Sequence, residues 1–237
     1  MKKILLITFV AIFVFSSCKQ DSLGVSTVTT YATMTLNGNS DLFWQLNTPF
    51  VDPGCKAVEG TTDISSKIVV SSNVDATKGG KYSMTYKVAN SDGFFAEITR
   101  TVYVYEPTSP LNGYYTSNIS RSALLTGIVS AKGPYNILVF GVGSGNFWVE
   151  DLMGGWYYYG SAYGYAYAGT SILSLNADNT LSIGKSYPTG FGSASGMVFT
   201  ATSTYDPATK TFVLHTNMGD TPAIVFNVTL NNPQPLN

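Results

Sequence analysis

Apolar and polar residues alternate with a period of two along much of this sequence, and this pattern restricts the fold more than any other feature. In residues 82–88, Tyr, Met, Tyr and Val alternate with Ser, Thr and Lys. Such alternation is typical of strands that bury one face. No helical period persists over three turns, and turn sequences such as Asn37-Gly38 separate the strand patterns. We therefore predict an all-β protein.

Short strand patterns continue through residues 111–237, which contain only nine charged residues. This part is predicted to form a second antiparallel β domain, either a barrel or a sandwich. Glycines that interrupt the strands favour the barrel-like form, because they mark places where a sheet bends. The predicted strands cover residues 135–142, 146–152, 156–159, 163–167, 171–176, 180–183, 197–205, 211–215 and 223–230.

Residues 1–17 are predicted to be a signal peptide. Two lysines precede an apolar run at residues 4–15, and a helix of this length spans about 18 Å, too short for a bilayer core of about 30 Å. The sequence Ser-Ser-Cys that ends at Cys18 resembles the bacterial lipobox. The resemblance implies a lipid on Cys18 and a tether at residues 18–30; an ordinary secretory signal, with Cys18 following by chance, is the alternative.

Three motifs within residues 31–106 resemble a known family. They are D-P-G-C-K-A at 52–57, G-K-Y-S-M-T-Y at 80–86 and T-R-T-V-Y-V at 99–104. In this order and spacing they resemble the bacterial Ig-like domain, an accessory module without catalytic residues. The resemblance implies an immunoglobulin-like sandwich at residues 31–106. Two prolines stiffen residues 107–110, which we interpret as a linker to the second domain.

The charged and metal-binding residues exclude several functions. The net charge of −1 provides no basic stripe for nucleic acid. One His and two Cys are too few for most zinc sites, and no Asp-rich calcium loop is present. Glycoside hydrolysis needs two carboxylates across a cleft, whereas Glu150 and Asp151 are neighbours that would point apart on a strand. We predict no enzyme activity, no metal and no cofactor.

An aromatic segment at residues 147–167 carries the candidate binding site. It holds nine of the 32 aromatic residues of the chain. Flat rings that carry a polar atom suit sugars, whose apolar C–H patches stack on ring faces, and they equally suit protein interfaces or a domain core. The two carboxylates either accept hydrogen bonds from sugar hydroxyls or form a solvated turn. The candidates for glycan binding are Trp148, Glu150, Asp151, Trp156, Tyr157, Tyr158, Tyr159, Tyr163, Tyr165 and Tyr167.

A lipobox followed by an Ig-like module and a neutral, aromatic-rich β domain resembles the surface lipoproteins of Bacteroides-type polysaccharide-utilisation systems. The resemblance implies an outer-membrane lipoprotein, at the cell surface or on the periplasmic face, that binds a polysaccharide or oligosaccharide without catalysis. In the alternative interpretation, the protein is an adhesin or a structural subunit of an outer-membrane protein complex, and the same rings contact a protein. A barrel that encloses a small apolar ligand is a third interpretation.

Overall fold

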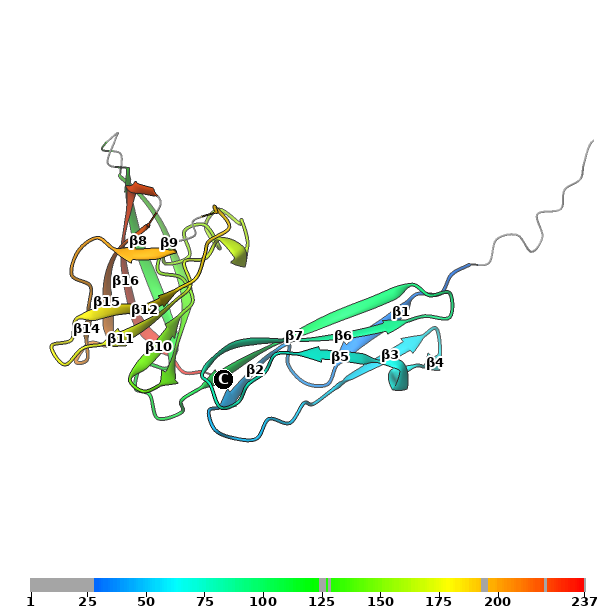
Figure 1. Ribbon diagram of the computed structural model, residues 1–237. Helices are drawn as coiled ribbons and strands as arrows, with labels where there is room; N and C mark the ends of the chain where they lie inside the picture. The colour runs from blue at the N-terminus through cyan, green and yellow to red at the C-terminus, as the bar shows by residue number, and fades with distance from the viewer. Residues whose placement is uncertain (1–27, 124–126, 128, 193–195, 220, 237) are drawn as a thin grey trace, which may run out of the picture.

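The computed structural model describes residues 28–123, 127, 129–192, 196–219 and 221–236. The predicted signal peptide, Cys18 and most of the predicted tether lie outside these residues. Within the described residues the regular structure is β-strand, apart from two short 3-10 turns, η1 (Ser65–Lys67) and η2 (Tyr165–Tyr167), which confirms the predicted all-β class (Figure 1). None of the helical segments in these ranges has the length and apolar character needed to cross a membrane.

The N-terminal domain is an immunoglobulin-like sandwich, as predicted. One sheet contains β1, β3 and β4, and the other has the order β2-β7-β6-β5. Alternate residues of β6 and β7, including Tyr86 and Val102, point between the sheets and form a buried core. The strands are β1 (Ala32–Leu36), β2 (Asp41–Gln45), β3 (Cys55–Glu59), β4 (Thr62–Asp63), β5 (Val69–Ser72), β6 (Gly80–Ala89) and β7 (Phe95–Tyr105).

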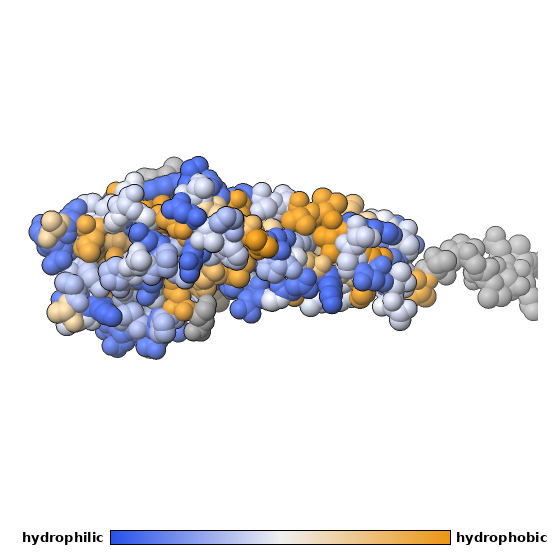
Figure 2. All heavy atoms as spheres, turned by 90° about the horizontal axis from the view of Figure 1, so that it is seen from below, coloured by the Kyte–Doolittle hydropathy of each residue, from blue (hydrophilic) through white to orange (hydrophobic). Residues whose placement is uncertain are grey.

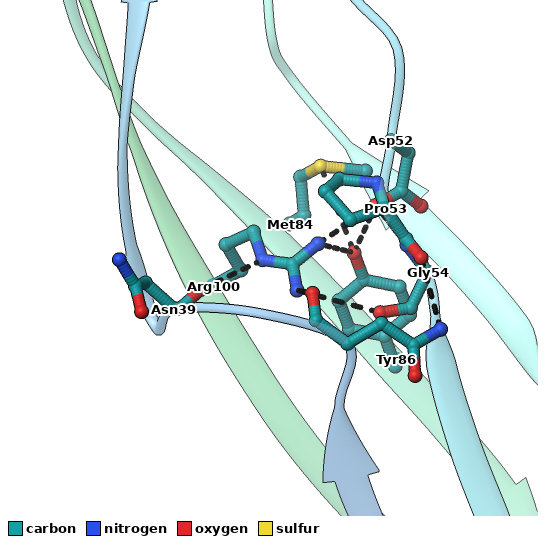
Figure 3. A network of polar contacts seen from close by, with 8 residues as sticks. Asn39, Asp52, Pro53, Gly54, Met84, Tyr86 and Arg100 are labelled. Atoms are coloured by element: carbon teal, nitrogen blue, oxygen red, sulfur yellow. Dashed lines mark hydrogen bonds and ion pairs between the residues drawn. The ribbon is translucent and has the colours of Figure 1, made fainter.

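A buried arginine on β7 ties the two sheets of this sandwich together (Figure 3). The Arg100 side chain is fully buried. Its guanidinium lies 3.0 Å from a carboxylate oxygen of Asp52 and donates hydrogen bonds to Tyr86 and to the carbonyl oxygens of Asn37 and Asn39. These partners satisfy a charge that would otherwise be costly to bury. The D-P-G and T-R-T motifs of the sequence therefore meet in space.

The C-terminal domain is a nearly closed barrel built from nine described strands. Their order is β12-β11-β10-β9-β8-β16-β15-β13, and β14 pairs with β15. The two edges of this sheet meet where the Leu181 amide donates to the Ser203 carbonyl. The strands are β8 (Gly113–Ala123), β9 (Val129–Gly143), β10 (Asn146–Val149), β11 (Ser171–Leu175), β12 (Leu181–Ser186), β13 (Met197–Phe199), β14 (Thr204–Asp206), β15 (Thr211–Met218) and β16 (Thr221–Gln234).

The barrel interior forms the main hydrophobic core. Phe147 of β10 and Phe212 of β15 point inward and are fully buried, with Tyr115 against Phe212. Because side chains alternate along a strand, neighbouring residues of β9 and β10 point outward from the barrel. Phe140 and Trp148 lie on that outer face and are also buried, in a separate cluster that includes residues of the N-terminal domain. Both faces of β9 are therefore covered at residues 137–141.

Three of the predicted strands are wrong. Residues 156–159 form turns, and residues 163–167 contain η2 instead of a strand. The predicted strand at 197–205 is divided into β13 and β14. In the aromatic segment, Gly154 and Gly155 adopt positive φ angles of 66° and 94°, which turn the chain out of the sheet. Tyr163, Tyr165 and Tyr167 therefore do not lie on one face of a strand.

We expect Arg100→Met to lower the free energy of unfolding by about 3 kcal/mol, because it removes the counter-charge of Asp52 and the donor to Tyr86 and two carbonyl groups. Chemical denaturation of the purified protein measures this change. The matched control is Lys56→Met, at an exposed position of β3, for which a change within about 0.5 kcal/mol is expected. An equally small effect of Arg100→Met would contradict the structural role of the network.

Candidate functional site

Two rows of side chains, one from each domain, meet at the domain interface. On the outward face of the N-terminal sheet, Phe43, Tyr103 and Lys81 are cross-strand neighbours on β2, β7 and β6. On the outer face of the barrel, the corresponding row across β9 to β12 is Phe140, Trp148, Ile172 and Lys185. The strand registers place these side chains in two rows, and the buried cluster that contains Tyr103, Phe140 and Trp148 shows that the rows face each other.

Aromatic rings connect the two rows. Tyr103 stacks on Phe43 at 5.1 Å between ring centroids and meets Phe140 edge-on at 5.8 Å. The Phe140 ring lies 5.8 Å from Trp148, which in turn lies 5.5 Å from Tyr187. Edge-to-face and offset-stacked geometries are favourable for aromatic pairs. The series of rings runs from β2 of the N-terminal domain to the end of β12 in the barrel.

The domains approach closely beside these rings. A Cβ atom built on Gly79 would lie 2.4 Å from the Cα atom of Val142 on β9. Any larger residue at position 79 would therefore prevent this close contact between the domains. The end of the N-terminal domain packs on the barrel, because the Glu106 amide donates to the Gly141 carbonyl. The predicted linker does so too, since a Cβ atom built on Gly141 would lie 2.4 Å from the Cβ atom of Ser109. Figure 2 shows the two domains in direct contact, without a break between their surfaces.

The loop between β10 and β11, residues 150–170, completes the site. Its two ends are joined by Asp151, a fully buried carboxylate that accepts hydrogen bonds from the amides of Met153, Gly155 and Gly169. The Thr170 hydroxyl donates to the carbonyl of Glu150 at 2.8 Å. A buried carboxylate that satisfies three amides fixes the backbone, so Asp151 shapes the loop and is not available to a ligand.

A pocket of about 260 Å3 lies where the loop, the barrel and the N-terminal domain meet. Tyr165 stands beside the Lys81 ammonium, whose nitrogen is 3.2 Å from the ring centroid. The Tyr165 hydroxyl lies 3.1 Å from the Thr170 hydroxyl. Aromatic side chains and small residues therefore dominate the wall. The residues that line this interdomain pocket are Lys81, Trp148, Tyr165, Ala166, Ala168, Thr170, Tyr187 and Pro188.

Glu150 lies buried behind this pocket. One oxygen of its carboxyl group accepts hydrogen bonds from the Leu138 amide at 3.2 Å and from the Tyr159 hydroxyl at 3.4 Å. Burial raises the pKa of Glu150 to about 7, and the neighbouring Asp151 adds to the increase while the Leu138 amide and Lys81 oppose it. Neither carboxylate forms the solvated turn that was the alternative interpretation of this segment.

The ten candidates from the sequence are divided between different environments. Trp148 and Tyr165 line the interdomain pocket. Trp156 packs in the barrel core against Phe226 and is only 4% exposed, so the expectation that it stacks on a surface ligand was wrong. Tyr158 contacts both Tyr159 and Tyr165. It forms part of the loop behind the pocket.

A second group of rings lies on the other side of the loop. We call Tyr157, Tyr163, Tyr167 and Phe191 the outer ring cluster, because each of the tyrosines contacts Phe191. Tyr163 is 55% exposed and Phe191 is 42% exposed. Both side chains are therefore partly accessible to solvent.

Sequence reasoning missed Lys81 and Tyr187. Lys81 lies on the polar face of a predicted strand, and only the contact with the barrel places it in a pocket. Tyr187 follows β12 outside the aromatic segment, so the clustering of rings along the sequence did not reveal it. In the described ranges, no group of three or more His, Cys, Asp or Glu side chains has the arrangement needed to hold a metal ion.

We expect Glu150 to lower the free energy of unfolding by about 3 kcal/mol as the pH rises from about 4.5 to 7, because its pKa is about 7 in the folded state and 4.5 as an unperturbed group. Asp151, whose pKa burial raises to about 6, adds a further decrease over the same range. The folded protein binds more protons than the unfolded chain in this range, so folding is favoured at the lower pH. Denaturation at several pH values should show a decrease that is about 3 kcal/mol smaller for Glu150→Gln, which keeps the contribution of Asp151. The exposed control Glu97→Gln should keep the original slope; equal slopes for all three proteins would contradict the assignment.

Comparisons with known proteins agree with this architecture. A model of the family described as bacterial surface protein, Ig-like domain, matches residues 34–104. A family model for a C-terminal domain matches residues 105–232, more than half of the chain. No curated protein matches the sequence significantly.

Among solved structures, the crystal structure of the lipoprotein BT2262 from Bacteroides thetaiotaomicron is 30% identical, with a TM-score of 0.67. The match covers 85% of this chain and 100% of that one. A Bacteroides ovatus protein of unknown function is 8% identical, with a TM-score of 0.33 over 85% of this chain and 93% of that one, and this weak likeness carries no argument. The two matching families are not catalytic families. The chain therefore belongs to the bacterial surface lipoprotein family that includes BT2262, with an Ig-like domain followed by the C-terminal domain of that family.

Proposed function

We propose that this protein is a lipid-anchored outer-membrane protein that binds a saccharide, without catalysis, in the interdomain pocket. The observation that carries the proposal is the wall formed by Tyr165 and Tyr187, with the buried Trp148 behind them. Ring faces pack against the C–H patches of a pyranose, while hydroxyl and ammonium groups bind its oxygens. Thr170 and Lys81 supply such groups at the same pocket.

The shape of the site supports binding of one unit within a longer chain. Its volume of about 260 Å3 is slightly below the range of about 300 to 1,000 Å3 that is typical for drug-sized ligands. Contacts this limited suit affinities from micromolar to millimolar, roughly −4 to −8 kcal/mol. A protein that holds a polymer at a membrane gains from many such contacts.

The lining of the pocket supports a role without catalysis. No carboxylate is among the described lining residues. The nearby Asp151 is occupied by three backbone amides. Hydrolysis of a glycosidic bond would need two carboxyl groups that flank the substrate.

The anchor at Cys18 and the exposure at the cell surface are part of the same proposal. The lipobox-like sequence and the lipoprotein relative support them. The described chain enters the N-terminal domain at the end opposite the barrel (Figure 1). An anchor beyond that end would hold the pocket away from the membrane.

The outer ring cluster favours a second candidate function, which is binding of a partner protein in an outer-membrane complex. Exposed Tyr163 and Phe191 are side chains of the kind that anchor protein interfaces. This surface is separate from the interdomain pocket. Substitutions therefore distinguish the two functions.

We expect Tyr187→Ala and Tyr165→Ala each to weaken saccharide binding at least about tenfold, because each removes one ring of the pocket wall, and tenfold corresponds to about 1.4 kcal/mol. Calorimetric titration of the full-length protein in a sugar-free detergent against a polysaccharide panel measures this effect. The control Tyr31→Ala removes an exposed ring of the N-terminal domain and should leave the affinity unchanged.

Failure of every saccharide to bind, or unchanged affinity of both pocket variants, would contradict the proposal. Cross-linking to one outer-membrane protein that is lost in Tyr163→Ala, together with no saccharide binding, would support the second candidate.

A further inference from the structure

Two lysines lie against the rings of the interdomain pocket. The Lys81 ammonium is 3.2 Å from the Tyr165 ring centroid, and the Lys185 ammonium is 4.5 Å from that of Tyr187. Cation–π contacts of this kind orient an ammonium group without neutralising it. Both aromatic walls of the pocket therefore carry a positive charge beside them.

Neither lysine forms an ion pair in the described part of the chain. The ion pairs found there join Lys78 to Asp75 and Arg100 to Asp52. Lys132 shows the contrasting case, because its ammonium donates to the Gly160 carbonyl and the Ser161 hydroxyl. The charges at the pocket thus remain available to a ligand.

The surroundings of Lys81 compensate its charge only in part. Burial lowers the pKa of Lys81, while the carboxylates of Asp41 and Glu150 oppose this effect. Glu150 itself is held partly protonated near neutral pH by its own burial. Because a half-buried ammonium has lost part of its hydration, a ligand anion would gain a stronger interaction here than at an exposed lysine.

We propose that the interdomain pocket selects an acidic saccharide, in which a sugar unit stacked on Tyr187 places its carboxylate at Lys81. The inference rests on the proposed saccharide binding at the same pocket. A uronate combines both requirements, since its pyranose ring offers C–H patches and its carboxylate offers the counter-charge. Lys185 adds attraction at the outer side of the pocket, where salt weakens it more strongly.

The test uses oligosaccharides of galacturonate, glucuronate and mannuronate, each paired with its methyl ester. Esterification removes the charge and keeps the sugar backbone. The full-length protein in a sugar-free detergent is titrated with both members of each pair. We expect one acid to bind at least about tenfold more tightly than its ester, and this ratio should shrink when the salt concentration is raised.

Substitutions at Lys81 link the preference to the pocket. Lys81→Gln keeps a hydrogen-bond donor and removes the charge, so it should weaken binding of the acid about tenfold more than binding of the ester, while Lys81→Arg should retain the preference. The control is Lys87→Gln on the same strand, where the ammonium lies over Phe95 instead. This control should match the parent protein. Circular dichroism checks that each variant is folded.

The outcomes separate this inference from the proposal on which it rests. If an acid and its ester bind equally, or if the preference for the acid survives Lys81→Gln, the proposed selectivity for acidic saccharides is wrong. The proposal that the pocket binds a saccharide would still stand. The same conclusion follows if only neutral glycans bind and Tyr187→Ala abolishes that binding. Failure of all charged and neutral saccharides to bind would overturn both.

Discussion

The contact between Tyr103 of the N-terminal domain and Phe140 of the barrel is the interaction on which the rest of the structure depends. Both rings are buried, at 8% and 0% exposure, although each lies on the outward face of its own sheet. Domains joined by small polar interfaces move relative to one another, whereas a buried aromatic interface holds them in place. Because Lys81 is the cross-strand neighbour of Tyr103, the same contact brings an ammonium group to Tyr165 in the other domain. Lys81 lines the pocket only while the domains remain joined.

At the junction between the domains, the burial of charged groups affects their pKa values more than the number of charged residues does. The barrel domain is poor in charged residues, yet two of its carboxyl groups, Glu150 and Asp151, are buried at the start of the loop. Asp151 is satisfied by backbone amides and shapes the loop, whereas Glu150 has fewer donors and a pKa raised to about 7. The base of the loop is therefore held by hydrogen bonds. At the edge of the loop lies the ammonium group of Lys81, whose charge Glu150 and Asp41 compensate only in part. This combination suits a site that holds a ligand without transforming it.

The fold could be predicted from the sequence where one residue pattern determines one structure. Alternation identified most strands, and the D-P-G and T-R-T motifs identified the sandwich. Strand β8 was missed because Ser117 occupies an inward, fully buried position where alternation requires an apolar residue, and its hydroxyl donates to the Gly154 carbonyl. The loop was mistaken for strands because ring-rich sequences have high β propensity, while Asp151 and two glycines turn the backbone away. The pocket could be predicted only in part, since Lys81 and Trp148 meet through a contact between domains that no local pattern encodes.

Distance measurement between the domains tests the central claim most directly. Spin labels placed by Ser71→Cys on β5 and Ala177→Cys in the β11–β12 turn, both exposed, would report the separation by electron paramagnetic resonance, with Cys18→Ser and Cys55→Ser to prevent other labelling. A junction closed by Tyr103, Phe140 and Trp148 predicts a single narrow distribution without any ligand. A broad distribution, as expected for two domains swinging on a flexible linker, would contradict a pocket preformed between them.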